Sequence, residues 1–189
     1  MKYLNKNNYG YTLLEMIVSV AIVASLASII LANFSELGRT GDVHMAAQLF
    51  SNDLRVLQGH ALSIRKHENE PNTQSPSGSW GLYFNRPIND TEYYLYGDFS
   101  PENGLYDGGV EIHRVVKLPE NIIINRAGFN GAWNTNRANI LFVPPRPETS
   151  ISRNNPALRD TVQIELLDTV SMETKVVFVN KFGLIDVQN

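Results

Sequence analysis

The fold of this chain is decided by the stretch GYTLLE at residues 10–15 and the run of residues 16–35 that follows it. The run is uncharged and mostly apolar, and at about 1.5 Å per helical residue it is long enough to cross the hydrocarbon core of a bilayer. Glu15 therefore stands at the start of a membrane-length helix. A charge inside a membrane costs on the order of 2.5–3.5 kcal/mol at the bilayer centre, so we expect Glu15 to have a partner.

Charge is distributed unevenly along the chain. The 189 residues include 16 Lys and Arg against 19 Asp and Glu, for a net charge of −3, which argues against a protein that binds nucleic acid through phosphate contacts. Residues 1–10 carry Lys2 and Lys6 and no acid. A basic leader, an apolar helix and an acidic remainder fit the positive-inside rule for a membrane-inserted chain.

The apolar run does not end as a secretory signal peptide does. It has no clear small-x-small cleavage site followed by a polar mature start, and it passes through Asn33 and Ser35 into a further helical pattern. We therefore predict a retained membrane helix over residues 11–35. Small residues that favour close helix packing recur along it, namely Ser19, Ala21, Ala24, Ser25, Ala27, Ser28 and Ala32.

A second, amphipathic helical segment is predicted over residues 36–66. Gly38 and Gly41 lie near its start, where we expect them to weaken the helix. Beyond them, apolar residues recur every three or four positions, at Val43, Ala47, Phe50, Leu54, Leu57, Ala61 and Ile64. We expect this stripe to pack on the sheet of the same domain.

Residues 67–189 are predicted to form a β-rich domain. After a polar loop at 67–78 the hydrophobic period changes from helical to strand-like. The predicted strands are residues 80–84, 92–96, 110–118, 121–125, 138–143, 160–168, 175–179 and 184–187. A Gly-containing turn at 180–183 joins the last two as a hairpin. One long helix followed only by strands indicates an α+β fold, with the helix packed on an antiparallel sheet.

An acidic loop at residues 98–109 contains the metal candidates of the sequence. Its possible oxygen ligands are Asp98, Ser100, Glu102 and Asp107, and such ligands suit Ca²⁺. The spacing does not match an EF-hand, and a turn with solvated acids, which we favour, explains the same residues. We predict no other cofactor.

The sequence offers no catalytic motif. It contains no G-x-S-x-G, no H-E-x-x-H and no Gly-rich phosphate loop. His60 and Ser63 lie one helical turn apart, but without a third partner they make a poor triad. The chain has no Cys, which excludes disulfides and thiolate metal sites.

The segment GYTLLE and its apolar run resemble the processing motif of type IV pilins and type II secretion pseudopilins. The resemblance covers roughly residues 5–35. It implies the pilin fold, cleavage between Gly10 and Tyr11 by a prepilin peptidase, and methylation of the new amine of Tyr11. It also implies that Glu15 neutralises the amine of a neighbouring subunit.

The same resemblance implies partners and a location. The partners would be other pilin or pseudopilin subunits, the prepilin peptidase and an inner-membrane assembly platform. The subunit would cross the inner membrane once, with its C-terminal domain exported, and then enter an extracellular or periplasmic filament. Tyr11 replaces the usual Phe.

The remainder of the chain narrows the resemblance. A pilin without Cys cannot close the C-terminal disulfide loop of many pilins, which favours a minor pilin or pseudopilin. The body looks like the general secretion pathway H and fimbrial T type. A structural, non-enzymatic role is expected. The alternative is a surface binding module for adhesion or DNA uptake, with tyrosines that stack on a ligand unless they pack internally: Tyr93, Tyr94, Tyr96 and Tyr106. A membrane-anchored enzyme is a weaker alternative, because no catalytic site can be assembled from the sequence.

Overall fold

The computed structural model describes residues 11–71, 77–145, 148–155 and 157–188, with the side chains of residues 32–41 left out. The leader predicted at residues 1–10 lies outside these ranges. The chain separates into two compact units that divide between Gly38 and Arg39. The α-helix α1 (Leu13–Leu62) contributes its first part to one unit and its last part to the other.

The glycines at the unit boundary do not end the helix. The backbone remains helical through Gly38 and Gly41, although each Gly costs about 1 kcal/mol relative to Ala in a helix interior. The predicted weakening therefore does not divide α1 into two separate helices.

The helix ends four residues earlier than the predicted residue 66. Arg65 donates its backbone N–H to the carbonyl of His60 (2.9 Å), and Ile64 donates to Ala61 (3.0 Å). This pattern is that of a Schellman cap, whose left-handed residue is usually Gly. Here Ile64 takes that position with φ 49° and its side chain is 47% exposed. The prediction that Ile64 continues the buried stripe is therefore wrong, because the helix has already turned away.

In the described part of the chain, ten strands follow the helix, and all of their pairings are antiparallel. One sheet has the order β3-β2-β1-β6-β7 and the other β10-β9-β8-β4-β5. The strands of the first sheet are β1 (Trp80–Asn85), β2 (Asn89–Gly97), β3 (Ile112–Lys117), β6 (Arg137–Val143) and β7 (Glu148–Ser152). Those of the second sheet are β4 (Ile122–Phe129), β5 (Ala132–Thr135), β8 (Thr161–Asp168), β9 (Thr174–Asn180) and β10 (Ile185–Gln188).

The structure confirms an α+β fold in which a helix packs on antiparallel strands, and it adds details that the sequence analysis missed. The strands form two sheets, and β5 and β7 were not predicted. Asn130 and Gly131, both with positive φ, make the tight turn between β4 and β5, and Asn-Gly is a strong hairpin signal. The segment before β3, predicted as strand, is instead a short 3₁₀ helix, η1 (Gly109–Glu111).

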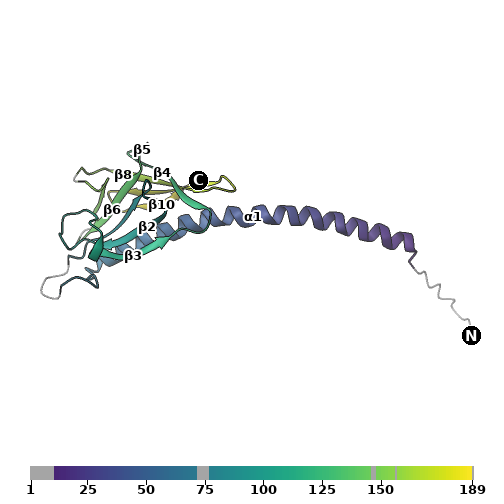
Figure 1. The fold of residues 1–189 in the computed structure, drawn as a ribbon, viewed down its shortest axis with the longest axis horizontal. Helices are drawn as coiled ribbons and strands as arrows, with labels where there is room; N and C mark the ends of the chain where they lie inside the picture. The colour runs from purple at the N-terminus through teal and green to yellow at the C-terminus, as the bar shows by residue number, and fades with distance from the viewer. Residues whose placement is uncertain (1–10, 72–76, 146–147, 156, 189) are drawn as a thin grey trace, which may run out of the picture. The chain divides into compact units, whose positions relative to one another are not determined.

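The second part of α1 and both sheets share one hydrophobic core, and Figure 1 shows the strands gathered against this part of the helix. Phe50 lies 4.6 Å from the ring of Tyr93 in β2. On the other side, Gln58 donates to the Gly183 carbonyl (3.1 Å) and Arg55 to the Ile185 carbonyl (3.3 Å), at the start of β10. Every residue of this core lies at position 43 or beyond, so residues 39–189 contain the complete core.

Leu54→Ala should lower the free energy of unfolding of the fragment 39–189 by about 2–5 kcal/mol, because it leaves a cavity in a close-packed core. Leu49→Ala is the matched control, since Leu54 is 0% exposed and Leu49, on the same helix, is 51% exposed. We expect the control to change stability by no more than about 0.5 kcal/mol. Urea unfolding followed by circular dichroism measures both, and equal losses would contradict the packing described here.

Candidate functional site in the N-terminal helix

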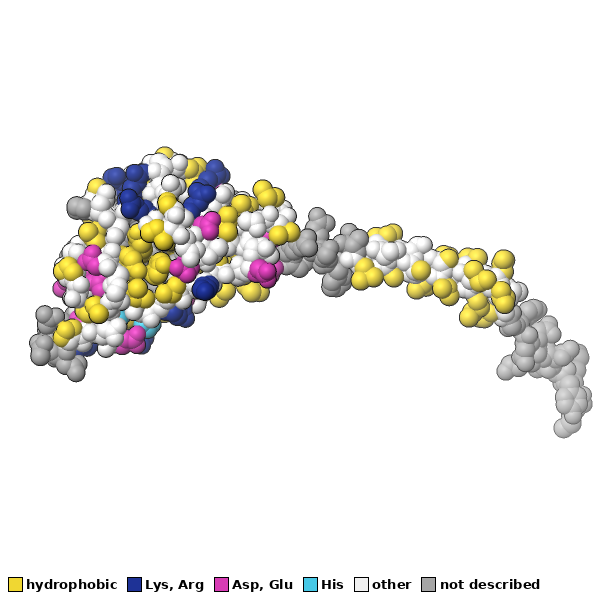
Figure 2. Space-filling model, viewed as in Figure 1, with side chains coloured by type: hydrophobic (Ala, Val, Ile, Leu, Met, Phe, Trp, Pro, Cys, Tyr) yellow, Lys and Arg dark blue, Asp and Glu magenta, His cyan; other side chains and the backbone are white. Residues whose placement is uncertain are grey.

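The membrane-length part of α1 exposes an extended apolar surface. Residues Leu13–Leu31 have a mean hydropathy of 2.4 and are long and apolar enough to cross a membrane. None of this span is buried by the described part of the chain, and Figure 2 shows its hydrophobic side chains at the surface. Apolar surface of this extent is unfavourable in water, so lipid or other helices must cover it.

Thr12 is the N-cap of this helix. Its hydroxyl oxygen accepts the backbone N–H of Glu15 (3.2 Å), and its carbonyl accepts the N–H of Met16 (3.2 Å). Threonine followed three residues later by glutamate is the sequence of a capping box. This role for Thr12 was not predicted, although the Thr-x-x-Glu spacing is a recognised signal for a helix start.

Serine hydroxyls along the membrane-length segment are satisfied within the helix. Ser19 donates to the Glu15 carbonyl (2.7 Å), Ser25 to that of Ala21 (2.8 Å) and Ser28 to that of Ala24 (2.8 Å). A hydroxyl without a partner is costly in an apolar medium. Because these bonds are internal, the segment can enter lipid or a helix bundle without leaving these hydroxyls unpaired.

Glu15 is the one carboxylate on the membrane-length segment. It lies in the first turn of α1 and is exposed, and no described side chain forms an ion pair with it. The helix dipole favours a carboxylate at this end, so Glu15 also stabilises the start of its own helix. An exposed carboxylate is also available to a partner outside the chain, as the assembly role requires.

Of the two predicted processing residues, the structure describes only Tyr11. Gly10 lies outside the described residues. Tyr11 precedes the N-cap Thr12 and is exposed. The scissile bond expected from the sequence therefore adjoins the start of the membrane-length helix.

The three acidic calcium candidates, Asp98, Glu102 and Asp107, do not form a close group of ligand atoms among the described residues. Asp98 is 2% exposed, and its two oxygens accept the backbone N–H groups of Asn103 (3.1 Å) and Gly104 (2.8 Å). Asp107 accepts the side-chain amide of Asn103 (2.8 Å). The oxygens of Asp98, Glu102 and Asp107 do not all lie within 4.8 Å of one another in the described part of the chain.

A buried glutamate outside the predicted set organises this loop. Glu111 of η1 accepts backbone N–H groups from Phe99 (3.3 Å), Ser100 (3.0 Å) and Asp107 (3.1 Å). Burial raises the pKa of Glu111 and also raises the pKa of Asp98 from 3.8 to about 6, while the N–H donors oppose both shifts. The sequence analysis missed Glu111, because its partners are set by the fold of the loop.

The tyrosines proposed as a stacking platform take part in internal packing. Tyr93 faces the helix and donates its hydroxyl to Asp53 (2.8 Å), whereas Tyr96 is buried on the opposite face of the sheet and donates to Asn139 (2.5 Å). Tyr106 stacks on Tyr83 with ring centroids 4.4 Å apart. Tyr94 is partly buried, and its hydroxyl bonds Glu92 (2.6 Å). Packing therefore accounts for these residues better than a ligand platform does.

The side chains of His60 and Ser63 bond to other groups and not to each other. The Ser63 hydroxyl donates to the carbonyls of Gly59 (2.9 Å) and His60 (3.0 Å), and the Nε2 atom of His60 accepts from Arg65 (2.6 Å). Neither group is oriented as a nucleophile and its base.

Asp98→Asn should change the pH dependence of stability of the fragment 39–189. The pKa of Asp98 is raised in the folded state, so the stability due to its protonated form is present below pH 3.8 and is lost as the pH rises through 6. The asparagine side chain does not titrate in this range. We therefore expect the free energy of unfolding of the variant, relative to that of the wild type, to rise by up to about 3 kcal/mol between pH 3.5 and pH 7.

Urea unfolding at four pH values across this range measures the difference between the two proteins. Other titrating groups are common to both and cancel in the difference. A difference that stays constant with pH would show that Asp98 ionises normally in the fold.

Comparison with known families identifies the N-terminal segment. Residues 5–31 match the prokaryotic N-terminal methylation motif. No curated protein and no solved structure matches the chain. The matched segment includes Gly10, Tyr11 and Glu15 and ends where the apolar helix span ends, at Leu31. The chain thus carries the N-terminal motif of type IV pilins and pseudopilins, followed by an α+β pilin-like architecture.

Proposed function

We propose that this protein is a structural subunit, a minor pilin or pseudopilin, of a type IV pilus or a type II secretion-like filament. The observation that carries the proposal is the coincidence, in residues 5–31, of the methylation motif and an unburied apolar helix. A soluble enzyme or binding domain does not need an exposed apolar helix of this length. A filament does, because packed helices from many subunits bury it.

Processing follows from the motif. A prepilin peptidase on the cytoplasmic face cleaves between Gly10 and Tyr11 and methylates the new amine of Tyr11. Gly10 suits a scissile bond because it has no side chain to hinder access to the backbone. Thr12 supports the same site, because this N-cap lies one residue after the new N-terminus and the helix begins at the next residue, Leu13.

Glu15 then pairs with the amine of a neighbouring subunit. The ammonium of Tyr11 would lie at the positive end of the helix dipole, where a cation is disfavoured, so it gains from a nearby carboxylate. Such a pair is far stronger in a low-dielectric helix bundle than in water. A subunit inserted at the wrong height would leave both charges unpaired, so the pair also sets the axial register.

Before assembly the subunit resides in the inner membrane. Lys2 and Lys6 retain the leader in the cytoplasm under the positive-inside rule, and the C-terminal domain is exported. An inner-membrane assembly platform then moves the subunit into the filament, which is extracellular or periplasmic. The domain forms the filament surface and the helix its core.

Within the family, the general secretion pathway H and fimbrial T type fits best. The chain has no Cys for a C-terminal disulfide, and its helix is followed only by strands. We assign no DNA-binding role, since the net charge is −3. We assign no catalytic activity, since the sequence offers no catalytic motif. The packed tyrosines give no separate support to a surface binding module.

Replacing Gly10 by Ala or a bulkier residue should prevent maturation, because a side chain at this position obstructs the scissile bond. Intact-mass measurement of protein co-expressed with a prepilin peptidase should show only precursor for the variant. The wild type should begin at methylated Tyr11. Asn8→Ala, also in the leader, is the control and should mature normally. A mature variant of normal mass would overturn the assigned cleavage position.

Glu15→Gln should be processed normally and yet enter filaments poorly, with incorporation reduced at least about tenfold, because the neighbour's amine is left unpaired in a low-dielectric core. Asp42→Asn removes one exposed charge from the same helix outside the membrane-length segment and should assemble normally. Immunodetection in sheared filament fractions measures incorporation. Equal incorporation of both variants would exclude the pairing role of Glu15.

A further inference from the structure

Three of the four histidines of the chain gather at one place in the C-terminal unit. His60 lies in the last turn of α1, His67 in the loop after it, and His113 in β3. The ring centroids of His67 and His113 are 5.9 Å apart, and those of His60 and His113 are 6.4 Å apart. The fourth, His44, is exposed and bonds Gln48.

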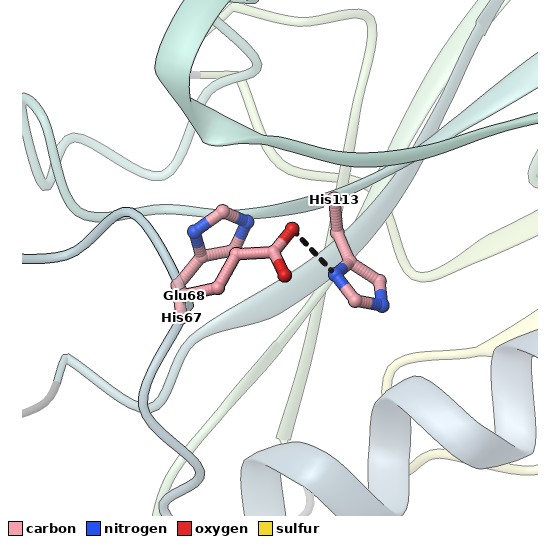
Figure 3. A group of neighbouring side chains, drawn as sticks. All are labelled: His67, Glu68 and His113. Atoms are coloured by element: carbon pink, nitrogen blue, oxygen red, sulfur yellow. Dashed lines mark ion pairs between the residues drawn. The ribbon is translucent and has the colours of Figure 1, made fainter.

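Two of these histidines and a glutamate present ligand atoms to one another. Donor atoms of His67, Glu68 and His113 all lie within 4.8 Å of each other. Figure 3 shows the carboxylate of Glu68 between the two imidazole rings. The Nδ1 atom of His113 is 3.5 Å from the Glu68 carboxylate, without a hydrogen bond between them.

His67 has an unsatisfied nitrogen in a buried position. His67 is only 2% exposed. Its Nδ1 atom accepts the backbone N–H of Asn69 (3.1 Å), so the neutral ring carries its proton on Nε2. That Nε2 atom is buried and has no hydrogen-bond partner. Buried polar groups are normally paired, so an unpaired nitrogen beside two other ligand groups indicates a missing ligand.

The fold holds His67 firmly in this position. Its ring lies between Trp80 and Phe99, at centroid distances of 5.3 Å and 5.0 Å. Its backbone N–H donates to the carboxylate of Glu70 (3.1 Å). Gly97 leaves the space that the ring occupies, since a Cβ there would lie 2.8 Å from the Cδ2 atom of His67. Such packing preorganises one ligand.

We propose that His67, Glu68 and His113 bind a divalent transition-metal ion of the zinc type. Two imidazoles and one carboxylate are a known zinc donor set, with water in the fourth position. Burial lowers the pKa of His67, which keeps its ring neutral, as ligation requires. The inference concerns the C-terminal unit alone and does not depend on the filament proposal.

Binding requires small local changes. In a tetrahedral zinc site with bonds of about 2.0–2.1 Å, the ligand atoms are about 3.3 Å apart, so the donors must move closer. Glu68, whose side chain is 62% exposed, has the freedom to do so. Coordination through Nε2 moves the proton of His67 to Nδ1 and gives up the bond from Asn69. The total number of protons on the ring is unchanged.

A metal at this site would join the loop that leaves α1 to β3. These segments are distant in sequence and meet only in the folded chain, so an ion bound to both would favour the folded state. The chain has no Cys, so no disulfide can serve this purpose. An ion that binds only the folded state raises its stability by mass action.

Titration of the fragment 39–189 with Zn²⁺ alone tests the proposal, using protein without a polyhistidine tag. Calorimetry should show one ion bound per chain, and the melting temperature should rise with Zn²⁺ concentration. Glu68→Gln and His113→Asn should each weaken binding at least about tenfold. His44→Asn, the histidine outside the cluster, should bind as the wild type does.

Nuclear magnetic resonance of the imidazole nitrogens reports on His67 without mutating this buried residue. On addition of Zn²⁺, the nitrogen signals of His67 and His113 should shift and those of His44 should not. The proposal is overturned if no ion binds, if both Glu68→Gln and His113→Asn retain wild-type affinity, or if His44→Asn loses as much affinity as they do.

Discussion

Two apolar surfaces of α1 have to be covered, the membrane-length span Leu13–Leu31 and the stripe from Val43 to Ala61, and the rest of the structure depends on how this is achieved. From Val43 to Ala61 the cover is internal, because both sheets pack their inner faces on one stripe of the helix. From Leu13 to Leu31 the described chain provides no cover at all. The first part therefore depends on lipid or other subunits, whereas the last part belongs to a domain with a complete core of its own.

In the membrane-length part of α1, the serine hydroxyls described above are paired within the helix, whereas the carboxylate of Glu15 is not paired with a described side chain. In the membrane-length part, the hydroxyls of Ser19, Ser25 and Ser28 bond to the helix itself, and Thr12 caps its start. Glu15 is left without a described partner. An unpaired charge is penalised in an apolar medium, which is the reason for proposing that Glu15 pairs with a neighbouring subunit.

Buried polar groups in the domain differ in whether they have hydrogen-bond partners, and this difference distinguishes a structural group from the proposed metal ligand. Glu111 is buried and accepts three backbone N–H groups, so the loop around it needs nothing further. His67 is equally buried, yet its Nε2 atom has no partner. Burial alone does not indicate a binding site; burial of an unsatisfied nitrogen beside Glu68 and His113 does.

Local features of the sequence determined the membrane-length helix, the amphipathic stripe, the hairpin at 180–183 and the processing motif, because hydropathy, helical period and turn chemistry act over a few residues. The tertiary structure decided the rest. Division into two sheets and the pairing of β7 depend on contacts between distant strands, and Ile64 ends the helix in a position where sequence rules expect Gly. His67 and His113 meet only because the loop after α1 returns to β3, and no local pattern encodes that distance.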